Sequence, residues 1–174
     1  MTLNEFARQV HKNAVQHGWW ETERPIHEII ALIHSEWSEA LEEYRAGRDL
    51  IWYAEDGKPE GIAVELIDGL IRILDYLVHE NVPVIGATME MRNIKPDDKI
   101  DWPDMTVPSL IAILHFYTSY AWLLRKDDCF YSTLYKCILI VFVWFKKHDL
   151  DVEEIALKKH EYNKTRPYKH GKVC

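Results

Sequence analysis

Apolar positions along the chain recur at helical spacing, and no stretch shows sustained strand-like alternation. The pattern predicts six main helices and one shorter one, with the shorter helix over 88–93 and the main helices over 2–17, 25–46, 62–80, 108–126, 130–148 and from 151 to just before Pro167. Thr2 with Glu5, and Asp151 with Glu154, have the spacing of helix-capping residues. The sequence therefore predicts an all-α fold, a helical bundle built around a core four-helix arrangement.

The third of these segments is apolar on nearly all sides. Between 62 and 78 its charges fall on one narrow stripe, formed by Glu65, Asp68, Arg72 and Asp75. A helix of this kind belongs in the middle of a bundle, so its charged groups are expected to be at least partly buried. Buried carboxylates need a partner, and we expect Arg72 to neutralise Asp75 or Asp68. The remaining acids then require a metal or a cationic ligand.

Two acidic signatures carry the candidate chemistry: Glu36-x-x-Glu39 and Glu65-x-x-Asp68. Spacing of i, i+3 puts both carboxylates of each pair on one face of its helix. Four such groups on neighbouring helices repel one another unless a cation lies between them. Hard oxygen donors suit Mg²⁺, with Mn²⁺ as a substitute, better than zinc. The alternative interpretation is a solvated acidic edge with an Asp68–Arg72 ion pair.

Bulk properties narrow the function classes. The 174 residues suit a single domain over 1–174, and a net charge of −7 argues against binding a nucleic-acid polymer or an anionic membrane. Three cysteines without a CxxC spacing indicate reduced thiols. The N-terminus lacks the pattern of a secretory signal, and the apolar run 137–145 is too short to span a bilayer. We expect a soluble, cytoplasmic protein with that run in a buried core helix.

An internal repeat relates the two halves of the chain. The segment starting at Ile29 lies over the one starting at Leu110, so that His34 matches His115, and the segment from Glu65 lies over that from Thr133. The apolar positions persist, but the acids Glu36, Glu39, Glu65 and Asp68 fall opposite Tyr117, Tyr120, Thr133 and Lys136. This predicts one metal site in the first half, 1–95, and a degenerate copy in the second, 106–174. Shared helical amphipathicity is the alternative explanation.

These motifs resemble the all-α nucleoside triphosphate pyrophosphohydrolases, in particular the MazG-like proteins, which are related to dimeric dUTPases. The resemblance is carried by ExxE, a moderate spacer and ExxD, by HGWWE, by LIHSEWSEALEEYR, and by K-x-x-x-N-x-x-RPY-x-HGK from Lys159. It implies Mg²⁺-dependent hydrolysis of an NTP or dNTP to the monophosphate and pyrophosphate. It also implies a homodimer, or a pseudo-dimeric monomer if one chain already contains both halves.

The resemblance and the local pattern together suggest roles for individual residues. Glu36 or Glu39 is the expected catalytic base in addition to its role as a metal ligand. Lys159, Asn163 and Arg166 lie at i, i+4 and i+7 on one helical face and are the expected phosphate or sugar contacts. Weaker candidates are Lys169 and Lys172, and the rival pair in the first half is Arg92 and Asn93.

Recognition of the base is assigned to residues near the end of the first helix. Trp19 or Trp20 offers an aromatic ring for stacking, with Trp20 the preferred candidate, and Asn13 offers an amide to read the edge of the base. Packing is the alternative role for the tryptophan pair. Trp37, on the apolar face of its helix, is predicted to be core, and the matched His34 and His115 to be structural.

Three other functions compete with this one. A di-iron carboxylate bundle needs Glu-x-x-His on two helices, and no glutamate in this chain is followed by histidine at that spacing. A catalytically inactive helical module that binds a nucleotide or a protein remains open. Phosphoribosyl-ATP hydrolysis belongs to the same superfamily, but those domains are typically shorter and lack a duplicated layout.

Overall fold

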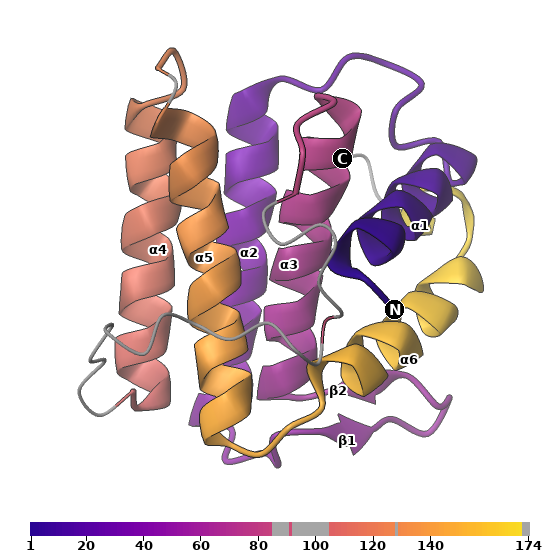
Figure 1. The fold of residues 1–174 in the computed structure, drawn as a ribbon. Coiled ribbons are helices and arrows are strands. Elements are labelled where there is room, and N and C mark those ends of the chain that lie inside the picture. The colour runs from indigo at the N-terminus through magenta and orange to yellow at the C-terminus, as the bar shows by residue number, and fades with distance from the viewer. Residues whose placement is uncertain (85–90, 92–104, 128, 172–174) are drawn as a thin grey trace.

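The computed structural model shows an all-α helical bundle, as predicted (Figure 1). It describes residues 1–84, 91, 105–127 and 129–171. The short helix predicted over 88–93 falls almost entirely outside the described residues, as do the candidate contacts Arg92, Asn93 and Lys172.

The main helices lie close to the predicted segments: α1 (Leu3–Gln16), α2 (Ile26–Arg45), α3 (Ile62–His79), α4 (Val107–Leu123), α5 (Cys129–Lys147) and α6 (Val152–Lys164). The predicted capping residues make the expected bonds. Thr2 and Glu5 form a reciprocal capping box, and the Asp151 side chain accepts from the first backbone N–H groups of α6.

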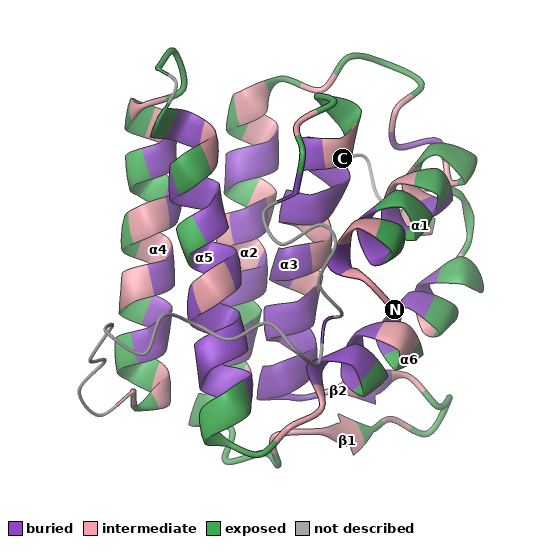
Figure 2. Ribbon diagram, in the orientation of Figure 1, coloured by how far each residue is buried: buried purple, intermediate pink, exposed green. Residues whose placement is uncertain are grey.

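Four long helices, α2 to α5, form the bundle, and α1 and α6 lie against α3 on one side of it (Figure 1). Helix α3 is central because it contacts α1, α2, α5 and α6. It is buried along most of its length (Figure 2), as its nearly all-round apolar character predicts. Its few charged side chains therefore sit inside the molecule or at the edge of a pocket.

Helix α5 is long and apolar enough to cross a membrane by length and composition. In the bundle, however, 67% of its apolar window is buried against protein, as expected for a core helix. This agrees with the prediction that the run 137–145 belongs to the core.

A small β-hairpin was missed by the sequence pattern. Strands β1 (Trp52–Tyr53) and β2 (Pro59–Glu60) pair antiparallel in the segment between the predicted helices 25–46 and 62–80. Each strand has two residues, which is too short for alternation to be visible. The hairpin leads directly into α3 through Gly61, whose φ of 108° and contact with backbone carbonyls leave no room for a side chain.

The α2–α3 hairpin and the α4–α5 hairpin contact each other through residues at matching positions of the predicted repeat. The imidazoles of His34 and His115 stack with 5.0 Å between ring centroids, and their Nδ1 atoms are 2.7 Å apart. The fully buried Trp37 donates its indole N–H to Thr118 Oγ1 at 3.0 Å. Contacts between equivalent positions are typical of two units related by a twofold axis. They agree with the predicted duplication and with structural roles for these residues.

Candidate metal and substrate site

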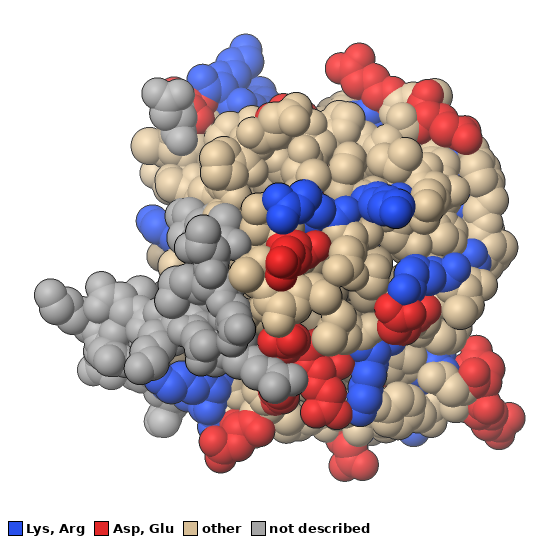
Figure 3. Space-filling model, turned by 45° about the vertical axis from the view of Figure 1, so that its right-hand side comes forward, with Lys and Arg blue, Asp and Glu red and all other residues tan. Residues whose placement is uncertain are grey.

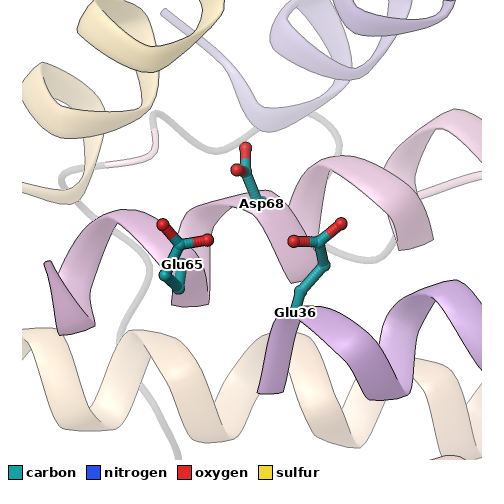
Figure 4. Close-up of side chains that lie close together, drawn as sticks. All are labelled: Glu36, Glu65 and Asp68. Carbon is teal, nitrogen blue, oxygen red and sulfur yellow. The ribbon is translucent and has the colours of Figure 1, made fainter. Parts of the chain in front are cut away.

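Three of the four predicted metal ligands lie together. Carboxylate oxygens of Glu36 from α2 and of Glu65 and Asp68 from α3 all lie within 4.8 Å of one another (Figure 4). The i, i+3 spacing brings Glu65 and Asp68 to one side of α3, and the packing of α2 on α3 brings Glu36 to them. Glu36 and Glu65 are only 6% and 4% exposed, which rules out a solvated acidic edge.

The fourth predicted ligand, Glu39, is exposed but lines the same pocket. It lies one turn after Glu36 on α2, at the solvent side of the cluster. Three carboxylates of the predicted ExxE and ExxD pairs therefore lie close enough to share one cation, and the fourth, that of Glu39, lies at the edge of the pocket.

Burial makes this cluster electrostatically unfavourable when all its carboxylates are ionised. Burial, reinforced by the charge of Asp68, raises the pKa of Glu65 to about 9. The same two causes, in the same order, raise the pKa of Glu36 to about 7, against the lowering effect of Arg72. Without an added cation, Glu65 is therefore protonated at neutral pH. A bound divalent cation would remove this penalty.

Two cations, the buried Lys159 and the half-buried Arg72, already contact the acids. Lys159 Nζ lies 2.9 Å from Asp68 Oδ2, and the lysine side chain is 1% exposed. Arg72 Nε donates to Glu36 Oε1 at 3.0 Å. The expected pairing of Arg72 with Asp75 or Asp68 is thus wrong, because α2 presents Glu36 directly to the guanidinium.

Asp75 belongs to a different cluster. Its Oδ1 lies 2.7 Å from His11 Nδ1 and accepts the indole N–H of Trp20 at 2.9 Å. It lies about two turns beyond Asp68 on α3, opposite α1, so it takes no part in the acidic cluster.

The acidic cluster forms part of a pocket of about 120 Å³. Residues from α1, α2, α3, α6, the hairpin and the C-terminal turn line it, among them Asn13, Trp19, Ser35, Lys58, Lys159, Asn163, Arg166 and His170. The lining therefore combines carboxylates with cations and uncharged polar groups. Such a pocket can take a ligand that is both metal-bound and anionic.

Most predicted substrate contacts reach this pocket. Lys159, Asn163 and Arg166 all line it from α6 and the residues just after it, and Asn13 lines it from α1. Lys169 does not; its ammonium lies 5.8 Å from the ring centroid of Tyr168.

The structure separates the two neighbouring tryptophans. Trp20 lies outside the pocket lining, its ring stacked on His79 with 3.6 Å between centroids and its N–H bound to Asp75. Trp19 lines the pocket instead. The position of Trp20 therefore does not support its preference as the stacking residue. Trp19 reaches the pocket lining, but its ring is buried, with the Arg24 guanidinium 5.2 Å and the Arg72 guanidinium 5.7 Å from its centroid, which favours a packing role.

The pocket residues that sequence reasoning missed include Lys58 and His170. Lys58 comes from the unpredicted hairpin, where its ammonium lies 2.5 Å from Glu60. His170 belongs to the C-terminal RPYKHG string, which follows the last predicted helix and to whose histidine no role was given. The charged proline-rich stretch KPEG and the string RPYKHG were the available signals.

On the face shown in Figure 3, neither positive nor negative side chains predominate. There, Lys and Arg are interspersed with Asp and Glu.

Comparison with protein-family models, curated proteins and solved structures gave no match to this chain. No family is therefore assigned. The resemblance to MazG-like proteins stays an interpretation of the motifs, and the function is argued from the pocket itself.

Proposed function

We propose that the chain is a Mg²⁺-dependent nucleoside triphosphate pyrophosphohydrolase, converting an NTP or dNTP to the monophosphate and pyrophosphate. The observation that carries this proposal is the convergence of three carboxylates from two helices on a pocket whose lining also includes Lys159 and Arg166. Carboxylates alone repel a polyphosphate and cations alone do not hold a metal. A pocket with both suits a metal–polyphosphate complex.

Glu36, Glu65 and Asp68, with Glu39 at the margin, would hold the cation. Their oxygen donors fit Mg²⁺, with Mn²⁺ as a substitute. When bound, such an ion neutralises charge on phosphate oxygens and acidifies a coordinated water. The raised pKa values of Glu36 and Glu65 support this assignment, because they show that the protein gathers these acids at an electrostatic cost.

The cationic residues would bind the phosphates. Lys159 and Arg166 lie seven residues apart, so both project to one side of α6 and its end. Lys58 adds a cation from the hairpin. These groups orient the triphosphate across the acidic cluster and compensate its charge, which the acids alone would repel.

A catalytic base has to accept the proton of the attacking water. Of the two predicted candidates, Glu36 is buried and tied to Arg72, whereas Glu39 is exposed at the pocket edge and can pass a proton on to solvent. We assign the proton transfer to Glu39 and a ligand role to Glu36.

The test is direct: incubate the protein with a panel of NTPs and dNTPs and Mg²⁺, and measure both pyrophosphate and nucleoside monophosphate. Stoichiometric formation of both from at least one nucleotide is expected, with none in EDTA. The second candidate is a nucleotide-binding module without turnover. The ion pairs Lys159–Asp68 and Arg72–Glu36 favour it, because they partly balance the acids without a metal. Tight nucleotide binding with no product from any panel member would select that module.

A further inference from the structure

The C-terminal turn Tyr168–Gly171 is docked against the end of α1 and the residues that follow it. The backbone N–H of Lys169 donates to the carbonyl of His17 at 3.0 Å, and the His17 ring lies 3.0 Å from the carbonyl of Arg166. The Tyr168 hydroxyl contacts the Glu21 carboxylate. Its ring packs over Gly18, where a Cβ would lie 2.1 Å from a ring carbon. The turn is therefore held in place by several independent contacts.

This docking maintains an unusual backbone conformation. Lys169 and His170 are consecutive non-glycine residues in the left-handed region, with φ of 45° and 51°. Residues other than glycine rarely adopt this backbone conformation, and it persists only where surrounding contacts impose it. Its effect here is to direct the His170 side chain into the pocket.

The His170 imidazole is uncharged and incompletely bonded. Its Nε2 atom is buried and has no hydrogen-bond partner among the described residues. The ring meets Trp19 edge-on, with 5.4 Å between centroids and an interplanar angle of 88°. Burial, followed by the charges of Arg166 and Arg72, lowers the pKa of His170 to about 3. The ring is therefore neutral at physiological pH, although cations surround it.

Two amide oxygens of the pocket resemble His170 Nε2 in lacking a hydrogen-bond partner within the part of the chain that the structure describes. Oδ1 of Asn13 and Oδ1 of Asn163 are buried and lack partners among the described residues, in side chains that are 9% and 7% exposed. Amide oxygens accept hydrogen bonds and therefore need donors. The oxygens of an ionised triphosphate offer none, whereas sugar hydroxyls and base N–H groups do. The two asparagine oxygens can therefore accept hydrogen bonds from the nucleoside but not from the phosphates.

We propose that His170 is a substrate-positioning residue whose Nε2 hydrogen-bonds the nucleoside part of the substrate beside Asn13 and Asn163. The docked C-terminal turn then forms one wall of the specificity pocket, and Trp19 holds the histidine ring in place. This inference rests on the proposed function and adds to it that selection of the nucleoside depends on uncharged groups in the pocket lining.

The experiment compares two ligands on the full chain with Mg²⁺ present: an α,β-imido nucleoside triphosphate, chosen from those the wild type binds, and inorganic tripolyphosphate. His170→Phe keeps a ring against Trp19 but removes Nε2. Calorimetry should show about tenfold weaker binding of the nucleotide, as for one lost hydrogen bond to a buried group, and tripolyphosphate affinity within about twofold of wild type. In turnover assays, KM should rise by a similar factor while kcat stays within about threefold.

Tyr168→Phe is the matched control, because it removes the hydroxyl contact with Glu21 and leaves the ring over Gly18. It should leave both affinities within about twofold, and His170→Gln should recover part of the lost nucleotide affinity. Unchanged nucleotide binding in His170→Phe, or an equal loss for both ligands, would overturn the inference while the proposed function stands. A wild type that binds no nucleotide at all would overturn the proposed function and this inference with it.

Discussion

The α2–α3 and α4–α5 hairpins place very different chemistry at matching positions. The first holds Glu36, Glu65 and Asp68 in mutual contact range. The second has Tyr117, Thr133 and Lys136 at the matching positions, with the Lys136 ammonium 5.3 Å from the Tyr117 ring centroid. A favourable cation–aromatic contact thus stands where the first hairpin has repelling acids.

The comparison shows that a helical hairpin of this kind does not need the acids in order to pack. Thr133, which matches Glu65, satisfies its hydroxyl within its own helix by donating to the Cys129 carbonyl at 2.9 Å. Glu65 instead has a strongly raised pKa because burial and Asp68 oppose its charge. The first hairpin therefore holds buried acids where the second has uncharged or cationic side chains, which is the contrast that the proposed cation site would produce.

The largest expected effect is on turnover, which should respond to a substitution in the α2–α3 hairpin but not to one at the matching position of the α4–α5 hairpin. Asp68→Asn should lower turnover by about 1,000-fold, because it removes a charged metal ligand at the reacting centre. Lys136→Gln, at the matching position of α5, should leave turnover within about twofold. Pyrophosphate release measures both, and far-UV circular dichroism checks that each variant keeps its helices. Substantial activity in Asp68→Asn would place the metal elsewhere.

A second prediction compares how much the buried Lys159 and the exposed Lys136 contribute to the free energy of unfolding. Lys159→Met leaves Asp68 without its buried partner and should lower the free energy of unfolding by about 3 kcal/mol in EDTA. The exposed Lys136 loses only a cation–aromatic contact in Lys136→Met, at a cost of about 0.5 kcal/mol. Urea unfolding of both variants measures the difference, and similar values for the two would contradict the buried pairing.

A third prediction concerns pH. Because folding raises the pKa of Glu65 from 4.5 to about 9, the folded state binds the extra proton, and stability is lost as pH rises through this range. Between pH 6.5 and 8.5, the metal-free protein should lose on the order of 2 kcal/mol. Glu65→Gln should flatten this slope and be more stable than wild type at pH 8.5. Urea unfolding in EDTA at a series of pH values gives the slope; a flat wild-type profile would refute the prediction.

The smallest effect tests packing within the first hairpin. A Cβ at Gly69 would lie 2.1 Å from the Trp37 ring, so Gly69→Ala should destabilise by about 1 kcal/mol despite the higher helix propensity of alanine. In a Trp37→Phe background the same change should cost clearly less, because the smaller ring leaves room. Thermal unfolding of the four proteins in this cycle measures the coupling; equal costs in both backgrounds would mean that Trp37 is not the obstacle.

Much of the fold was predictable because helical periodicity and capping are local. Thr2 and Asp151 begin their helices as their spacing predicts, and the acidic pairs reach one cluster because i, i+3 spacing fixes a common face. The β-hairpin was not predictable, because two-residue strands leave no periodic signal.

Other features depend on tertiary packing. Trp19 and Trp20 are neighbours after the end of α1, where no helical repeat fixes their directions, so the sequence did not show which one reaches the pocket. The partner of Arg72 depended on how α2 lies on α3. The role of His170 depended on a chain segment more than 140 residues away, as its contact with Trp19 shows.

The stacked His34 and His115 rings give the contact between the hairpins its own response to acid. Their Nδ1 atoms are close enough to share one hydrogen but not to carry two positive charges, and burial lowers the pKa of both from 6.5. Mildly acidic solution therefore destabilises the contact between the two halves, while it removes the cost of ionising Glu36 and Glu65. Burial lowers the pKa values of His160 and His170 as well, so these opposite responses would give the metal-free molecule a stability maximum near neutrality, set by buried imidazoles against buried carboxylates.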